Sequence, residues 1–221
     1  AEGINAMGTW AALSADEVTR RKAAYARAAA QDVAARARAL AAAWEPNGFL
    51  QQLTTAGRGS TLFVTQQSAL SAVAEGPFHL DTDTKDLRLA APAGVRNCTM
   101  MTCPDAMESQ WADRGKQHLR NNLAGARLIL EGCAAGGGLG FDDLLESAGA
   151  SSLATEMRND LNAAEGGIQA IPGESLRQAL ANNRAAVVSA HNAVKAITDF
   201  LKMEFSATLQ IRSQRVEGDH D

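Results

Sequence analysis

The sequence predicts an all-α protein made of antiparallel helix bundles. Two observations favour this fold class. Apolar residues recur at spacings of three, four or seven through most of the chain, which is the period of an amphipathic helix. No segment shows the alternation of apolar and polar residues that is typical of a half-buried strand. Helices with such stripes, joined by short turns, pack into bundles.

The first helix is predicted from Ser14 to Trp44. Ser14 and Glu17 have the spacing of a capping box, in which the two side chains bind amides at a helix start. Pro46 disfavours helix at the residue before it and so predicts the end of the helix. One stripe of apolar residues follows this helix, and we expect it to be buried: Val18, Tyr25, Ala29, Val33, Ala37, Leu40 and Trp44.

A shorter helix is predicted at Ser60–Glu75, followed by a long connection at 76–112. This segment lacks a sustained helical period and contains three prolines, Pro77, Pro92 and Pro104. Loops of such length in compact domains are usually functional or disordered. We therefore expect residues 1–75 to be the remainder of an N-terminal helical bundle, and residues 113–221 to form a C-terminal helical bundle.

Four helices are predicted in the C-terminal bundle, at Asp113–Cys133, Leu139–Glu146, Ser151–Ile171 and Ser175–Gln210. In the last of these, four apolar residues repeat every seven positions, as in packed antiparallel helices: Leu180, Val187, Val194 and Leu201. His191 lies on the same face. We predict that it is a core histidine with a hydrogen-bond partner, because buried polar groups are rarely left unpaired.

The charge of the chain excludes two classes of partner. The 221 residues carry a net charge of −4, whereas nucleic acids and anionic membranes attract clusters of lysine and arginine. No run approaches the ~18 apolar residues of a transmembrane helix. No signal segment opens the sequence, as expected for a mature secreted protein and equally for a cytosolic one. We expect neither nucleic acid nor a transmembrane segment.

Residues that could carry chemistry are sparse. A metallopeptidase needs metal ligands at helical spacing, such as His-Glu-x-x-His, and none of the four histidines stands in that pattern. His79, beside Asp81 and Asp83, permits either a weak cation site or a solvated acidic loop. Nucleophile arrangements and phosphate-binding loops are absent. The sequence therefore predicts no catalytic residue and no cofactor, apart from a possible weakly held metal ion.

Several segments resemble the imelysin family, all-helical bacterial envelope proteins associated with the acquisition of iron or other metals. Asn121–Gly125 and Ala134–Ser152, with the helical stretch that follows, resemble the back half of these proteins. Glu108–Trp111 is similar to the stretch before their third bundle helix, and Glu217–Asp219 to their acidic ending. The resemblance implies a helix bundle in the periplasm or outer envelope, with its signal peptide removed and a role in metal uptake.

The same resemblance extends to a motif near the start of the sequence. Imelysins carry a Gly-x-His-x-x-Glu motif, and Gly3–Gly8 fits its frame, with Asn5 in place of the histidine and Gly8 in place of the glutamate. Asn5 offers only a weak neutral oxygen and Gly8 no side chain, so the resemblance implies an emptied metal site. In the family this motif follows earlier helices. We expect either a missing N-terminal segment, which a separate fragment could supply, or a shortened homologue that folds alone.

Two aspartates complete the candidate ligand-binding residues. Asp142 and Asp143 occupy a place comparable to the first motif in the other repeat half of the family. With Asn5 and Glu108 they form the set that the resemblance implies. The alternative is an exposed acidic pair at a helix start, where the helix dipole favours carboxylates.

The three cysteines leave two interpretations open. Cys98 and Cys103 share one loop and could close a small ring, while Cys133 ends an apolar helix face. A Cys98–Cys103 disulfide would then form in an oxidising compartment, with Cys133 a buried free thiol. Three reduced cysteines are the alternative. The resemblance to envelope proteins favours the disulfide.

Three functions follow from these observations. The first is a noncatalytic envelope protein that binds or hands on iron, another metal, a metal complex or a partner protein. The second is a metallopeptidase, the activity for which imelysins were first named. The third is a structural or assembly module that packs its bundle against another chain.

Overall fold

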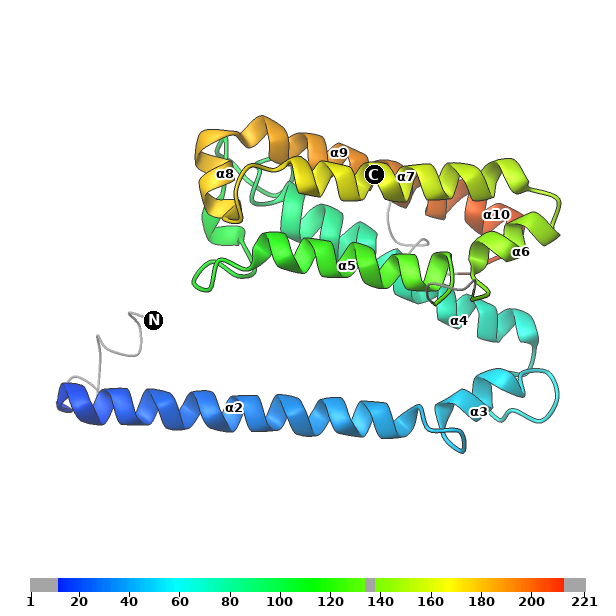
Figure 1. The fold of residues 1–221 in the computed structure, drawn as a ribbon, viewed down its shortest axis with the longest axis horizontal. Helices are drawn as coiled ribbons and strands as arrows, with labels where there is room; N and C mark the ends of the chain where they lie inside the picture. Colours follow the sequence, from blue (N-terminus) through cyan, green and yellow to red (C-terminus); the bar gives the residue numbers. More distant parts are fainter. Residues whose placement is uncertain (1–11, 134–137, 213–221) are drawn as a thin grey trace. The chain divides into compact units, whose positions relative to one another are not determined.

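The structure, a computed structural model, describes residues 12–133 and 138–212. Its regular elements in these ranges are all helices, and none of their residues lies in a strand, so the predicted all-α class is confirmed (Figure 1). The chain divides into two units, Ala1–Gln66 and Gln67–Asp221. This division lies before the predicted connection, which begins at residue 76.

Helix α2 (Ala15–Ala43) is the main element of the N-terminal unit. It begins as predicted, because the Ser14 hydroxyl accepts a hydrogen bond of 3.3 Å from the Glu17 amide. The Glu17 carboxylate instead binds the guanidinium groups of Arg20 and Arg21, at 2.7 and 2.6 Å. These hydrogen bonds, first that from Arg20, lower the pKa of Glu17 to about 2.

Within the described part of the N-terminal unit, the α2 stripe is not buried as predicted. Tyr25, Val33 and Leu40 are 74%, 66% and 63% exposed, and α2 contains no buried residue. The stripe has the period of a helix, but a period shows only which residues share a face. It does not show what covers that face.

A small aromatic cluster follows α2. Helix α3 (Phe49–Thr54) begins after Gly48, where an added Cβ would lie 2.4 Å from the Ala43 carbonyl oxygen. The rings of Trp44 and Phe49 meet edge to face with centroids 4.9 Å apart, and Phe63 meets Phe49 in the same way at 5.9 Å. These contacts join the end of α2, the start of α3 and the loop after α3 within the N-terminal unit.

The segment predicted as a connection begins as a helix. Helix α4 (Gln66–His79) contains Pro77 and continues into η2 (Leu80–Ala90), a π-helical segment. Buried residues recur along this stretch at steps of three or four: Ala74, Phe78, Asp81, Lys85 and Leu89. Two of these five residues, Asp81 and Lys85, are charged, and so the spacing of apolar residues alone does not reveal the helical period.

The loop after η2 is tied to the rest of the unit in two ways. Cys98 and Cys103 lie at disulfide distance, with a Cα–Cα separation of 6.0 Å. The Arg184 guanidinium donates to the Ala93 and Met101 carbonyls, at 2.7 and 2.8 Å. The short 3₁₀ helix η3 (Pro104–Ala106) follows.

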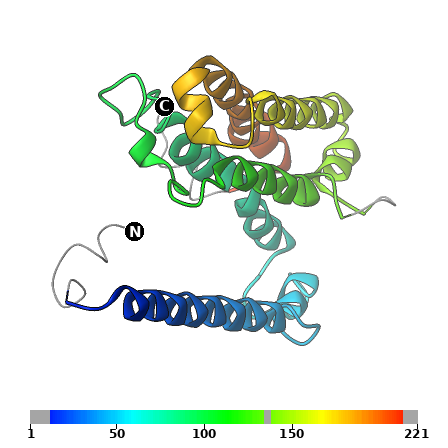
Figure 2. The ribbon, with the colours of Figure 1, turned by 60° about the vertical axis from the view of Figure 1, so that its left-hand side comes forward.

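The C-terminal unit is an antiparallel bundle. Helices α5 (Gly115–Leu130), α7 (Ser151–Ala170) and α9 (Arg184–Phe200) run beside α4 and η2 in alternating directions, and α6 (Phe141–Ser147) joins α5 to α7 (Figures 1 and 2). Element η2 packs on both α5 and α9, and α7 packs on both as well, which closes the ring.

The last predicted helix is divided. Helix α8 (Leu176–Asn182) ends before Asn183, whose side chain accepts a hydrogen bond from the Ala186 amide and starts α9. Beyond α9 the chain continues through η4 (Leu201–Phe205) and α10 (Ser206–Leu209). The four residues of the predicted heptad repeat are buried, and so is His191, whose Nδ1 lies 3.0 Å from the Asn192 side-chain oxygen.

The expectation that Cys133 is buried is wrong, because this cysteine is exposed. Helix α5 ends at Leu130, and Gly132 has a φ of +81°, a conformation that suits glycine and turns the chain away. Cys133 therefore leaves the face that Leu123 and Leu130 bury.

Candidate functional site

A groove between two packed helices is the candidate binding site of the C-terminal unit. Its walls are the end of α4 with η2 on one side and α5 on the other, and its volume is about 400 Å³. Apolar and small residues, among them Leu80, Ala126 and Ile129, form part of the lining. The polar lining residues are His79, Asp83, Thr84, Arg88, Asn121 and Asn122.

Two glycines shape this groove. At Gly76 an added Cβ would lie 2.8 Å from Cδ1 of Ile129, so this glycine lets α4 and α5 approach closely. At Gly125 an added Cβ would meet nothing within 4 Å. Gly76 therefore serves packing, while Gly125 leaves open space at the wall of the groove.

One wall presents a histidine and a carboxylate. His79 and Asp83 lie one helical turn apart, with Nδ1 of His79 2.7 Å from a carboxylate oxygen of Asp83. Both side chains are partly exposed. They bring together two of the three residues that the sequence suggested as a weak cation site.

The third residue, Asp81, points elsewhere. Its carboxylate is buried and lies 2.8 Å from the Lys85 ammonium and 3.4 Å from that of Lys202. Both sequence interpretations of this region, a cation site that includes Asp81 and a solvated acidic loop, fail because the segment is helical. On a helix, Asp81 turns toward the bundle interior while His79 and Asp83 face the groove.

Glu108 lies beside the groove through its contact with Arg88. The Arg88 guanidinium donates two hydrogen bonds to the Glu108 carboxylate, one from Nη2 at 3.0 Å and a shorter one from Nε. Nδ1 of His118 lies 3.4 Å from the same carboxylate. The hydrogen bond from Arg88 is the largest cause of the lowered pKa of Glu108. Glu108 therefore holds Arg88 in place at the groove.

The opposite wall presents amides. The Asn122 side chain donates a hydrogen bond of 3.0 Å to the Thr84 hydroxyl across the groove. The Asn121 side-chain oxygen accepts one of 2.9 Å from Gln117. In the sequence, Asn121 and Asn122 only form part of a segment that resembles the family. The structure places both residues in the lining of the groove.

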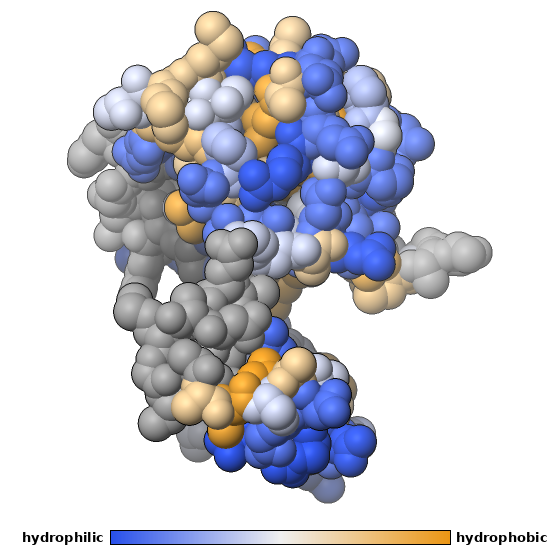
Figure 3. All heavy atoms as spheres, turned by 90° about the vertical axis from the view of Figure 1, so that its left-hand side faces the viewer, coloured by the Kyte–Doolittle hydropathy of each residue, from blue (hydrophilic) through white to orange (hydrophobic). Residues whose placement is uncertain are grey.

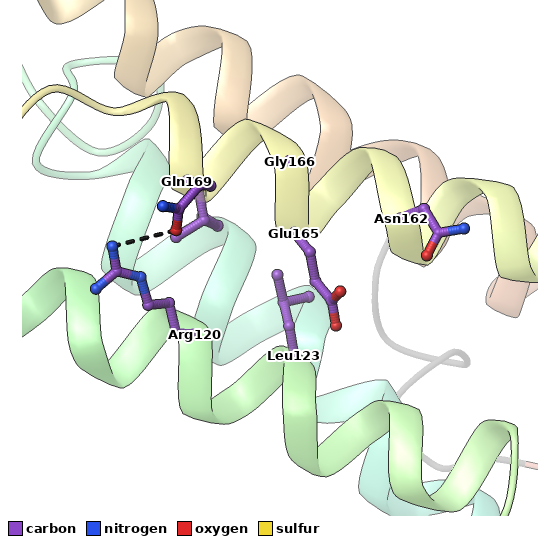
Figure 4. A pocket seen from close by; sticks show the side chains of 7 residues that line it. Arg120, Leu123, Asn162, Glu165, Gly166 and Gln169 are labelled. Carbon is purple, nitrogen blue, oxygen red and sulfur yellow. Dashed lines mark hydrogen bonds between the residues drawn. The ribbon is translucent and has the colours of Figure 1, made fainter. Parts of the chain in front are cut away.

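A second hollow lies between α5 and α7, with a volume of about 370 Å³. Figure 4 shows Arg120 and Gln169 on the two sides of this hollow. Nη2 of Arg120 donates a hydrogen bond of 3.3 Å to Oε1 of Gln169. Arg120 also binds both carboxylate oxygens of Glu174, and Arg127 reaches Glu165 at 2.9 Å. The charged residues at this hollow thus form ion pairs between α5 and α7, and between α5 and Glu174 after the end of α7. These ion pairs hold the two helices together.

The other candidate ligands lie away from the groove. Asp142 is buried and accepts hydrogen bonds from Arg158, the shorter at 2.9 Å. Asp143 accepts one of 2.8 Å from the Gly140 amide and so caps the start of α6. These contacts give both residues a role in holding α6. Asn5 and Gly8 lie outside the described residues.

No group of three or more histidine, cysteine, aspartate or glutamate side chains in residues 12–133 and 138–212 is arranged to hold a metal ion. No helix in these ranges is long and apolar enough to cross a membrane.

The fold and the groove define an all-helical bundle with a partly polar groove between two of its helices. Residues 8–202 match the family model of imelysin, a match that covers most of the chain. The chain belongs to the imelysin family. Neither the curated proteins nor the solved structures with which it was compared contain a match. Gly3–Met7 and the acidic ending at Glu217–Asp219 lie outside the matched segment.

Proposed function

We propose that this protein is a noncatalytic member of the imelysin family that binds iron or another metal, in the form of a metal complex, in the periplasm or outer envelope. Family membership over residues 8–202 carries the proposal. The resemblance of Gly3–Gly8 to the family motif, with Asn5 in place of the histidine and Gly8 in place of the glutamate, supports the noncatalytic part, because neither residue can hold a catalytic metal.

The groove between η2 and α5 is the site that we assign to the ligand. Its volume of about 400 Å³ lies in the range of small-molecule sites. Its walls offer an imidazole, a carboxylate, a guanidinium and two amides, a set that includes both donors and acceptors.

This set suits a complex better than a bare ion. A transition metal bound by protein alone takes three or four protein ligands, whereas His79 and Asp83 are the two adjacent metal-ligating groups of the groove. A metal that brings organic ligands of its own needs few from the protein. The amides of Asn121 and Asn122 can then hydrogen-bond the oxygen atoms of those ligands.

The cysteine pair supports the proposed compartment. Cys98 and Cys103 have disulfide geometry, and disulfides persist in oxidising compartments such as the periplasm. The family is of the envelope type, which agrees with this location.

Calorimetric titration of the full chain with ferric citrate and, separately, with Zn²⁺ tests the proposal. We expect ferric citrate to bind with a stoichiometry near one and Zn²⁺ to bind weakly. A combined His79→Ala and Asp83→Asn variant should weaken the binding of ferric citrate at least ten-fold, and Asn5→Ala should leave it unchanged. Asp105→Asn, on the exposed 3₁₀ helix η3, is the matched control for the loss of a carboxylate.

Two results would contradict the proposal. One is tight, stoichiometric binding of Zn²⁺ that Asn5→Ala abolishes, because it would restore the amino-terminal site. The other is chelator-sensitive proteolysis that is lost on changing Asn5 or Glu108, because it would establish the peptidase alternative.

A further inference from the structure

The hollow between α5 and α7 lies between two sets of polar contacts that cross from one helix to the other. At one end Arg120 binds Gln169, at 3.3 Å. At the other end Arg127 binds Glu165 and Asn162, each at 2.9 Å. The two arginines are seven residues apart on α5, which corresponds to about 10 Å along the helix axis. The helices are therefore joined on both sides of a hollow of about 370 Å³ (Figure 4).

Small and apolar residues form the middle of this hollow. Leu123 and Ile168 belong to its lining, and Figure 4 shows the Leu123 side chain pointing from α5 toward Glu165 and Gly166 on α7. A Cβ added at Gly166 would meet nothing within 4 Å. The space beside Gly166 can therefore hold a branched aliphatic group, with Leu123 as its apolar neighbour.

The Arg120 guanidinium has one edge whose donors are only partly used. Glu174 binds the end of the group, accepting from Nη1 and Nη2 at 2.7 and 3.0 Å. The second N–H of Nη2 and the N–H of Nε share the side edge. There the Gln169 amide oxygen accepts from Nη2 at 3.3 Å, and the buried Nε has no hydrogen-bond partner among the described residues. A carboxylate in the place of the Gln169 oxygen would accept from both nitrogens, as in bidentate arginine–carboxylate pairs.

Glu165 offers a negative charge to the same hollow. Its Oε1 accepts from Arg127, and its side chain is partly exposed. Glu165 and Gln169 are four residues apart on α7, about 6 Å along the helix axis. The donor edge of Arg120 and the Glu165 carboxylate are thus separated by about one helical turn. An α-amino acid has its carboxylate and ammonium groups on one carbon, and with a hydrogen bond at each end it bridges a gap of this size.

The dimensions of the hollow favour a small molecule as the occupant. Its volume lies in the range of small-molecule sites. The contacts across both ends leave no path along the helices for a longer peptide. Hydrophilic residues predominate on the face of the C-terminal unit that Figure 3 shows, as on a surface that faces solvent.

We propose that the hollow between α5 and α7 binds a neutral α-amino acid with a branched aliphatic side chain, such as leucine. The carboxylate of the ligand would bind Nε and Nη2 of Arg120 in place of Gln169, and its ammonium group would bind Glu165. Its side chain would lie against Leu123 beside Gly166. This site and the groove proposed for the metal complex have no lining residue in common, so neither proposal depends on the other.

Calorimetric titration of the full chain with L-leucine and two analogues tests the proposal. Isocaproate has the carbon skeleton of leucine without the amino group, and isoamylamine has it without the carboxylate. We expect L-leucine to bind with a stoichiometry near one. Each analogue should bind at least ten-fold more weakly, because each can satisfy only one end of the hollow.

Glycine substitutions locate the site. Gly166→Leu should abolish the binding of L-leucine, because its side chain fills the space that the ligand needs, and it should leave the binding of ferric citrate unchanged. Gly125→Leu is the matched control, since a Cβ added there also meets nothing within 4 Å but faces the groove beside η2. It should change the affinity for L-leucine less than three-fold. Circular dichroism confirms that each variant remains helical.

Polar substitutions test the two ends of the hollow. Glu165→Gln keeps an oxygen for Arg127 but removes the negative charge, and should weaken L-leucine binding at least ten-fold. Glu146→Gln changes another carboxylate that binds an arginine, on α6, and is the control that should have no effect. Gln169→Ala frees the side edge of Arg120 and should not weaken binding.

Four outcomes would overturn the proposal. The first is no binding of L-leucine to a chain that is folded by circular dichroism. The second is equal affinity for L-leucine and isocaproate, because the ammonium group would then not be recognised. The third is a loss of L-leucine binding in Gly125→Leu as large as in Gly166→Leu. The fourth is a ten-fold loss in Gln169→Ala, which would show that the ligand does not take the place of Gln169 at Arg120.

Discussion

At the scale of single residues, buried charges are used to hold helix ends in place. Lys116 is 2% exposed, and its ammonium donates to the carbonyls of Ile171 and Gly173, the latter at 2.7 Å, with that of Gln169 at 3.4 Å. Gln169 and Ile171 lie in the last turn and at the C-cap of α7, where carbonyls lack partners within the helix, and Gly173 lies in the turn that follows. Burial lowers the pKa of Lys116.

Lys116→Met should therefore destabilise the protein strongly. The variant keeps an apolar stem of similar length but leaves several buried carbonyl groups without a donor, which costs about 2–3 kcal/mol. Urea unfolding followed by circular dichroism measures this loss. Lys195→Met, which removes a partly exposed ion pair with Asp199, is the control and should cost less than about 1 kcal/mol. Equal losses in the two variants would show that Lys116 does not cap α7.

The pKa of Asp160 is shifted in the opposite direction. Burial raises its pKa above the ordinary value of 3.8, and repulsion from Glu156 and Glu204 adds to the shift. A carboxyl group with a raised folded-state pKa destabilises the native state at high pH. The destabilisation is present in full above the folded-state pKa and disappears as the pH falls below 3.8, where both states are protonated.

Asp160→Asn should consequently raise the free energy of unfolding at pH 7 by about 0.2–0.5 kcal/mol, the usual size of a like-charge pair one helical turn apart. At pH 3 the variant and the parent chain should unfold at the same urea concentration. Asp105→Asn, outside this carboxylate group, is the control. A variant less stable than the parent at pH 7 would show that the Asp160 carboxylate is stabilising.

At the scale of elements, α4 and η2 show what a search for apolar periods can miss. Sequence reasoning located α2, α5, α6 and α7 within a few residues, because apolar or small residues recur along each of them at the helical period. It missed the helix over 76–90, because Asp81 and Lys85 occupy two of its buried positions. Sequence reasoning therefore also missed the groove between η2 and α5, since this helix forms one of the walls of the groove.

The pair inside η2 should be essential to the bundle. Lys85→Ala leaves the buried Asp81 carboxylate with Lys202 at 3.4 Å in place of Lys85 at 2.8 Å. Removing one partner of a buried ion pair costs about 3–5 kcal/mol, and a remaining partner reduces that loss. We expect about 3 kcal/mol for Lys85→Ala and less for Lys202→Ala in urea unfolding. A larger loss for Lys202→Ala would reverse the order of importance of the two lysines.

At the scale of the whole molecule, the two units differ in how they are stabilised. Among the described residues, the large cluster of buried apolar side chains lies in the C-terminal unit, where Phe205 contacts the rings of Phe78, Phe141 and Phe200. The described part of the N-terminal unit has one long helix without a buried residue and a small aromatic cluster. The apolar period of α2 and that of α7 each show which residues share a helix face, and neither period shows what covers that face.

This difference predicts the effect of core and stripe substitutions. Leu161, on α7, is fully buried, and Leu161→Ala should lower the free energy of unfolding by about 2–5 kcal/mol, the usual cost of a cavity in a packed core. Val33→Asp, on the exposed face of α2, should change it by less than about 0.5 kcal/mol, because a surface substitution removes no buried contact. Urea unfolding of both variants in the full chain measures the two losses. A loss for Val33→Asp as large as that for Leu161→Ala would mean that the α2 face belongs to the folding core.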